Sequence, residues 1–160
     1  MARLKSSLTQ ILISHFEGVF AGPNGDYPAV LESLQGITPE QAAWKPAPDC
    51  NSIWQVVDHL TASKEWQIEM LEKGVADSPV WTQPAGDESL WEKSLSQLKE
   101  AHALLKDSLA KTTEEQLLTI PVPEWNRTWL ELLLSIAAHE AHHCGQIDYL
   151  RGLQSRAAKR

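Results

Sequence analysis

The 160 residues suffice for one domain with a full hydrophobic core and are too few for two, so we predict a single domain over residues 1–160. Apolar residues make up 42% and charged residues 22%, which is typical of a soluble globular protein and excludes a disordered or fibrous chain. The net charge of -7, without any cluster of Lys and Arg, excludes nucleic acid as an expected partner.

The first predicted element is a helix over about residues 3 to 20, which Gly22 and Pro23 end. A short helix follows Thr38, where Thr-Pro-Glu-Gln is a capping box with Pro at the first helical position. The second long helix begins at the capping box of Ser52 and runs to about Lys73, before Gly74. The expected inward stripe of the first helix contains Leu4, Leu8, Ile11, Leu12, His15 and Val19.

Residues 74 to 86 contain two prolines and two glycines, and we expect them to form a long connection that crosses over the bundle. A third helix is predicted over about residues 87 to 111, and a capping box at residues 113 to 116 predicts a short turn of helix. The fourth helix is predicted from Thr128 to about Leu150, before Gly152. Four amphipathic helices without a convincing strand predict an all-α fold, a helical bundle.

Three histidines on two of these helices form the candidate site. His139 and His143 are four residues apart and project from one face of the fourth helix, and His59 lies at an inward position of the second. An HxxxH pair alone is more often a hydrogen-bonded core feature than a metal site. Here, however, a third histidine can lie at the same height in the bundle. His59 lies about 12 Å from the start of its helix, and the midpoint of His139 and His143 lies about 16 Å from the end of theirs. These heights match when the fourth helix runs parallel to the first.

Three neutral imidazoles form an open site with room for water or substrate, which is typical of a catalytic metal. Such a site suits Zn, Ni, Fe(II) or Mn, and the sequence does not choose among them. Ser135 and Gln146 lie one turn to either side of the pair. They either hold metal-bound water and orient a ligand, or are polar residues satisfied at a helix contact.

Other residues near the histidines carry their own expectations. His142 should lie at the edge of the stripe and bond to a neighbouring helix, and His15 could line the pocket beside His59. His102 is expected to be a hydrogen-bonded core residue. Gly145, inside a helix, predicts a close approach of a neighbouring backbone.

Further expectations concern cysteine, tryptophan and location. Cys50 and Cys144 lack metal or disulfide spacing, so we expect reduced thiols in a cytoplasmic protein without a membrane segment or signal peptide. Seven Trp residues predict that some line a pocket, although core packing is the default for each one.

Two segments resemble the DinB/YfiT-like superfamily: WKPAPDCNSIWQVVDHL and TWLELLLSIAAHEAHHCGQIDYLR, the second with its His-xxx-His-x-Gly-Gln pattern. The resemblance covers nearly the whole chain. It implies a four-helix bundle in up-down-down-up order, a metal triad of His59, His139 and His143, Ni or Zn as the metal, and a homodimer. It also implies a metal-dependent enzyme, either a transferase that uses a low-molecular-weight thiol or a hydrolase.

The sequence therefore supports two hypotheses. In the first, the chain is an enzyme whose divalent metal activates a thiol or water for attack on a small-molecule substrate. In the second, the ion only clamps the second helix to the fourth, in a non-catalytic bundle that acts in protein interaction or stress response.

Overall fold

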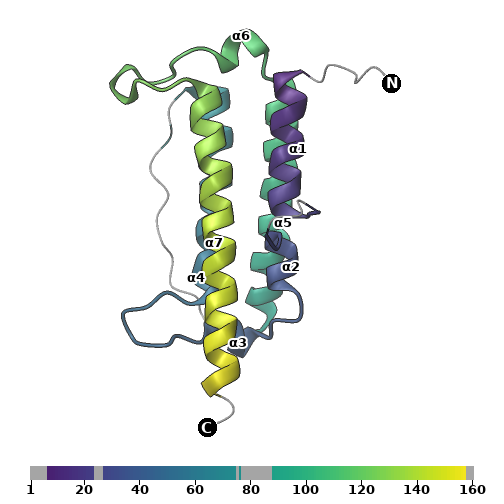
Figure 1. Ribbon diagram of the computed structural model, residues 1–160, viewed down its shortest axis with the longest axis vertical. Helices are drawn as coiled ribbons and strands as arrows, with labels where there is room; N and C mark the ends of the chain where they lie inside the picture. Colours follow the sequence, from purple (N-terminus) through teal and green to yellow (C-terminus); the bar gives the residue numbers. More distant parts are fainter. Residues whose placement is uncertain (1–6, 24–26, 75, 77–87, 158–160) are drawn as a thin grey trace.

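The computed structural model describes residues 7–23, 27–74, 76 and 88–157, and within these ranges helices are the only regular secondary structure. The predicted all-α class is confirmed. Four long helices, α1, α4, α5 and α7, lie lengthwise beside one another, and the short helices pack at their ends (Figure 1). The helices are α1 Leu8–Phe20, α2 Val30–Leu34, α3 Pro39–Ala43, α4 Ile53–Lys73, α5 Glu88–Lys111, α6 Glu114–Leu117, the 3₁₀ helix η1 Pro123–Trp125, and α7 Trp129–Ala157.

The ends of α4 lie where their capping residues predict them. The Ser52 hydroxyl accepts a hydrogen bond from the backbone N–H of Gln55, whose side-chain oxygen accepts one from the backbone N–H of Ser52. Gly74 ends the helix with φ at 77°, a left-handed conformation that glycine adopts at little cost. Because both ends of α4 are fixed locally, the height of His59 above the start of this helix follows from the sequence alone.

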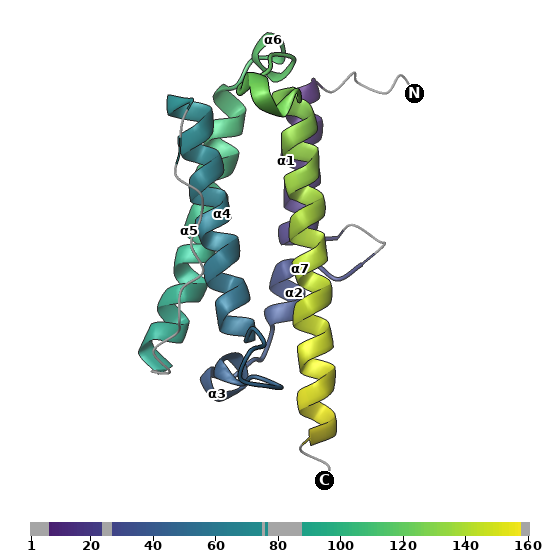
Figure 2. The same ribbon diagram turned by 90° about the vertical axis from the view of Figure 1, so that its left-hand side faces the viewer.

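Other predicted boundaries were wrong or lie outside the described residues. Helix α7 continues through Gly152 to Ala157, and its last turns extend beyond the start of α4 (Figure 2). A glycine that keeps helical dihedrals costs a helix only about 1 kcal/mol, so it need not end one. Residues 3 to 6 of the first predicted helix and most of the 74–86 crossover lie outside the described residues.

The apolar core has two clusters, one above the other along the bundle. The first is built around Trp54, Leu60, Leu98 and Ile147, and the second around Phe16 and its neighbours on the other long helices. Along α4, α5 and α7, polar side chains stand between the residues of one cluster and those of the other. The bundle therefore has a polar layer across its middle, formed by Lys64, His102, Glu140 and, at its outer edge, Glu17.

The predicted stripe of α1 needs two corrections. Phe16 is fully buried, whereas His15 and Ile11 are exposed. Phe16 and Phe20 extend the buried face around the helix by i to i+4 spacing, which turns position 15 toward solvent.

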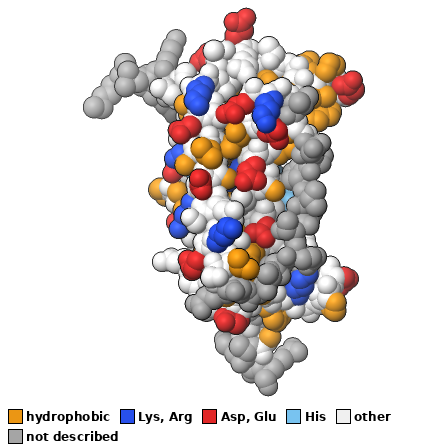
Figure 3. All heavy atoms as spheres, turned by 180° about the vertical axis from the view of Figure 1, so that it is seen from behind, with side chains coloured by type: hydrophobic (Ala, Val, Ile, Leu, Met, Phe, Trp, Pro, Cys, Tyr) orange, Lys and Arg blue, Asp and Glu red, His pale blue; other side chains and the backbone are white. Residues whose placement is uncertain are grey.

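On the face seen in Figure 3, acidic and basic side chains are intermixed with small groups of apolar ones. None of the helices in the described part of the chain combines the length and apolar content that crossing a lipid bilayer requires.

Candidate metal centre

The three predicted histidines meet between α4 and α7. The Nε2 atom of His139 lies 3.2 Å from Nε2 of His59 and 2.9 Å from Nε2 of His143. One ring nitrogen from each of the three residues can be chosen so that all lie within 4.8 Å of one another. Two helices that are far apart in sequence thus bring three imidazole nitrogens to one point.

The ring of His143 is oriented by a neighbour on the same helix. Its Nδ1 lies 2.7 Å from Oε1 of Gln146, an oxygen that can only accept a hydrogen bond. The proton of a neutral His143 ring is therefore on Nδ1, and the lone pair of Nε2 points at the other two rings. The amide nitrogen of Gln146 lies 3.1 Å from Nε2 of His142, which then acts as the acceptor.

All three rings are held neutral by their surroundings. Burial lowers the pKa of His59 to about 4, and the neighbouring His143 lowers it further. Burial likewise lowers the pKa of His143 to about 4, against the opposing effect of its hydrogen bond to Gln146. For His139 the pKa is also lowered, first by burial and then by His59. Neutral imidazole is the form that binds a metal, so the three rings are ready as ligands at pH 7.

The spacing of the nitrogens suits a cation. Ligands at 2.0–2.1 Å from a tetrahedral zinc ion lie about 3.3 Å from one another. The distances of 3.2 and 2.9 Å between the Nε2 atoms are close to that value. Without a cation, the same distances require that the Nε2 of His139 carry a proton and donate it to a neighbouring ring, and a metal would replace that proton. The donor set therefore fits a divalent metal held by three neutral ligands.

A cavity of about 330 Å³ adjoins the triad between α4 and α7. Its wall carries no charged side chain: besides the two neutral imidazoles it has two hydroxyl groups, one amide and the apolar surfaces of Trp66 and Ile136. Trp66 packs on Trp125 with ring centroids 6.1 Å apart. The residues that line it are His59, Ser63, Trp66, Gln67, Ser135, Ile136 and His139.

The sequence model that describes the DinB superfamily matches residues 26–147, a segment that contains all three histidines. The chain belongs to the DinB superfamily. A search of curated proteins found no match to it.

The remaining predicted residues of this DinB-superfamily protein lie in different places. Ser135 lies in the wall of the cavity, and Gln146 contacts His143 rather than a neighbouring helix. His142 is exposed and contacts Gln146 on its own helix, whereas a bond to a neighbouring helix was predicted. His15 is exposed on α1 and is not among the residues that line the cavity.

Two further expectations have clear outcomes. His102 is buried and hydrogen-bonded, as expected for a core residue. Gly145 is exposed, and a Cβ added there would meet nothing within 4 Å, so the predicted close backbone approach was wrong.

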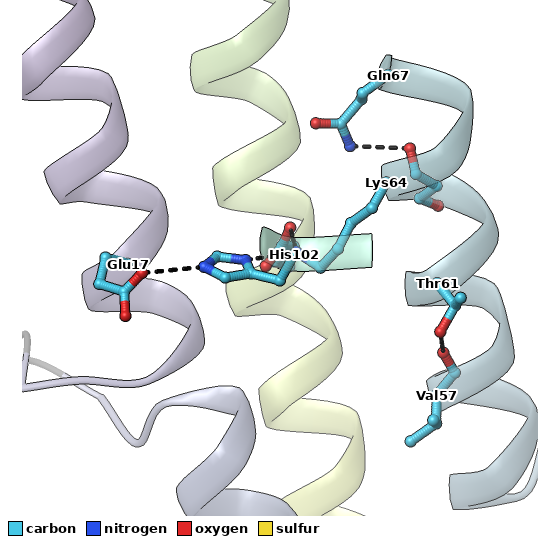
Figure 4. A network of polar contacts seen from close by, with 8 residues as sticks. Glu17, Val57, Thr61, Lys64, Gln67 and His102 are labelled. Carbon is cyan, nitrogen blue, oxygen red and sulfur yellow. Dashed lines mark hydrogen bonds and ion pairs between the residues drawn. The ribbon is translucent and has the colours of Figure 1, made fainter. Parts of the chain in front are cut away.

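Sequence reasoning identified His102 but missed the rest of the polar layer beside the triad (Figure 4). Lys64 is completely buried and donates a hydrogen bond to Glu140, which is also buried, and its Nζ lies 3.3 Å from Nδ1 of His102. The opposite nitrogen of His102 lies 3.2 Å from Glu17, which also accepts a 2.6 Å hydrogen bond from Lys106. The signal was present: Lys64 follows Leu60 by four residues, and Glu140 follows Ala137 by three, so each falls on an apolar stripe.

Proposed function

We propose that this chain binds one divalent metal ion through His59, His139 and His143 and acts as a metal-dependent enzyme on a small molecule. The observation that carries the proposal is the convergence of three neutral Nε2 atoms at the edge of a cavity. Membership of the DinB superfamily supports the same ligand set. Zinc or nickel is the expected ion, with iron or manganese as alternatives.

The chain's own residues determine what the cavity accepts. When bound, the ion would act as a Lewis acid that lowers the pKa of a thiol or water so that it attacks at neutral pH. Trp66 and Ile136 offer an apolar surface for the body of a substrate, and Ser63 and Ser135 offer hydroxyl groups. An uncharged wall favours an electrophile without formal charge, because a buried charge there would find no partner.

The attacking thiol, in the transferase form of the proposal, comes from a second small molecule. Burial, with Glu140 acting in the same direction, raises the pKa of Cys144 to about 12, so this thiol is protonated and unreactive at pH 7. We therefore propose a low-molecular-weight thiol as co-substrate, with water taking its place in the hydrolase form.

The cavity favours an enzyme over a non-catalytic clamp. An ion that only joined α4 to α7 would be best enclosed by a fourth ligand and packed side chains. Here two of the three histidines instead line a cavity large enough for a small molecule.

We also propose the up-down-down-up order for the bundle. Figures 1 and 2 support it: α1 and α7 begin at the same end, and α4 and α5 both begin at the other. A single domain over residues 1–160, a homodimer and a cytoplasmic location stay predictions.

Metal analysis together with a turnover assay tests the proposed function. Protein purified without a His tag should contain about one divalent ion per chain, and His59→Ala, His139→Ala and His143→Ala should each lose it because two imidazoles hold such an ion far more weakly. The metal-loaded protein should accelerate the conjugation of a bacterial thiol to an uncharged model electrophile, or the hydrolysis of an ester.

His15→Ala is the matched control, since it removes an exposed imidazole that is not part of the cavity lining. It should retain both the ion and the rate. Full metal content in the three triad variants would refute the assigned ligands. A loaded protein that accelerates neither reaction would favour the clamp.

A further inference from the structure

A buried lysine and a buried glutamate join the same two helices that carry the triad. The side chains of Lys64 on α4 and Glu140 on α7 are 0% and 1% exposed and contact each other directly. Lys64 follows His59 by five residues, and Glu140 stands between His139 and His143 in sequence. The pair therefore crosses the α4–α7 interface within two helical turns of every triad residue.

The Lys64 side chain is fixed by more than its glutamate. Its Nζ lies 4.9 Å from the centroid of the Phe20 ring and 3.3 Å from Nδ1 of His102. Phe20 and His102 stack with their centroids 3.8 Å apart, and Nε2 of His102 reaches Glu17 on α1. Contacts thus run without interruption from α1 through α5 and α4 to α7, and they hold the Lys64 ammonium group beside Glu140. Figure 4 shows Glu17, His102 and Lys64 of this series.

The α4–α7 interface needs such a contact. Helix α4 packs much more extensively along α5 than along α7. Residues of both α4 and α7 line the cavity beside the triad, so apolar side chains do not fill the space there. Packing alone therefore specifies the axial position of α7 against α4 less strongly than in an ordinary core.

The triad, by contrast, tolerates little displacement. A shift of α7 by one residue moves a side chain about 1.5 Å along the helix axis and turns it about 100°. Metal–nitrogen distances vary by only about 0.2 Å between good sites. A register error too small to unfold the bundle would thus separate His59 from its partners.

We propose that Lys64 and Glu140 are positioning residues of the metal centre, whose contact fixes the register of α7 against α4 and so brings His59 to His139 and His143. The inference rests on the proposed function, because it takes the triad to be the metal site. A buried charged pair adds little stability compared with apolar residues of the same size, whereas it can specify one register among several.

The test replaces the pair by apolar residues of similar length, Lys64→Met with Glu140→Leu, in the full chain. Two readouts are measured, since the first needs no metal. In the metal-free wild type, ring protons of His59 should show nuclear Overhauser effects to those of His139 and His143, because the ring centroids are 5.1 and 4.9 Å apart. In the double variant we expect a helical protein that has lost these effects.

The second readout is a Co²⁺ titration followed by visible absorption. The double variant should bind Co²⁺ ten to a hundred times more weakly than the wild type, the range typical of residues behind metal ligands, with altered absorption bands. Ser94→Ala is the matched control, because it removes a buried hydrogen bond of 2.9 Å that joins Trp54 on α4 to α5 instead. It should leave both readouts unchanged.

Each outcome decides one of the two proposals. Retained ring contacts together with Co²⁺ affinity within twofold of wild type in the double variant would overturn the positioning role and leave the metal site standing. A wild type that shows the ring contacts but binds no Co²⁺ would overturn the proposed function, and the ring contacts of the variant would still decide the register.

If the double variant does not fold, Glu140→Gln takes its place. This variant keeps an acceptor oxygen for Lys64 at the same side-chain length, so the ring contacts and the Co²⁺ affinity should stay within about threefold of wild type. A tenfold loss of affinity with intact ring contacts would assign the effect to charge and overturn the positioning role.

Discussion

The buried histidines of this chain have lower pKa values than a histidine exposed to solvent. Burial lowers the pKa of His102 to about 4, and the charge of Lys64 acts in the same direction while Glu17 opposes it. The neutral ring donates from Nε2 to Glu17 and accepts from Lys64 at Nδ1, so one tautomer completes the layer. His59 and His143 share the lowered pKa for the same main reason, which is burial.

These shifts predict that the metal-free protein loses stability in mild acid. An unfolded histidine has a pKa near 6.5, so between pH 6.5 and about 4 the unfolded chain binds more protons than the folded one. The stability contributed by neutral His102 is thus complete above pH 6.5 and is lost as the pH falls toward 4. Urea unfolding of the metal-free protein at pH 7 and pH 5 should show a lower midpoint at pH 5.

The variant His102→Gln isolates the contribution of this residue. Glutamine can donate a hydrogen bond to Glu17 and accept one from Lys64, but it does not titrate. The decrease of the urea midpoint between pH 7 and pH 5 should therefore be smaller in this variant. An equal decrease of the urea midpoint in wild type and variant would show that the pKa of His102 does not govern the loss of stability in acid.

The sequence predicted residues of the site unevenly, for a physical reason. His59, His139 and His143 fall on helical stripes at matching spacings, so both helix geometry and family resemblance reached them. Lys64 and Glu140 also fall on the apolar stripes of their helices, but neither local segment of sequence indicates that the two residues contact each other. A buried charge is recognisable only when its partner is known, and the pairing of α4 with α7 is a property of the folded chain.

Helices show the same division between local and distant causes. The starts of α3, α4 and α6 were predictable because Thr38, Ser52 and Thr113 carry side chains that cap them. Helix α2 was missed because its N-cap, Ala29, has no such side chain, and Glu32 alone bonds to the backbone there. By contrast, α7 continues through Gly145 and Gly152, because the packing of the helix outweighs the low helix propensity of glycine.

Gly145 offers a test at this scale. It is exposed inside α7, and a Cβ there would meet nothing within 4 Å, so Gly145→Ala should stabilise the protein by about 1 kcal/mol through helix propensity. Guanidinium unfolding of the metal-free protein measures the change.

Gly74→Ala is the opposite control. Its φ of 77° strains an alanine, so the same substitution should destabilise by about 1 kcal/mol although the space around it is also open. Equal effects of the two substitutions would contradict the assigned helix geometry.

The molecule as a whole has two apolar clusters that meet at a polar layer. The triad belongs to neither cluster, so none of the imidazoles contributes to the apolar packing of either one. The metal-free chain should therefore fold by itself, with the ion adding stability by mass action rather than causing the fold.

Metal removal tests this expectation. A free ion at a hundred times its Kd contributes about 2.7 kcal/mol, which for a chain of this size raises Tm by roughly 5–10 °C. Circular dichroism after chelation should show an unchanged helix content and a Tm lower by that amount. Loss of the helical signal would mean that the ion is structural, whereas an unchanged Tm together with a bound ion would exclude the clamp.

The neutrality of the three imidazoles has a consequence for electrical balance. Glu140, which stands between His139 and His143 in sequence, is engaged by Lys64, and Asp58, next to His59, is not among the residues that line the cavity. A divalent ion there would keep both of its positive charges next to an uncharged cavity wall. A bound ion would therefore favour anions as exchangeable ligands, so chloride, hydroxide and thiolate would compete for the same position and the ionic composition of the solution would set which one occupies it.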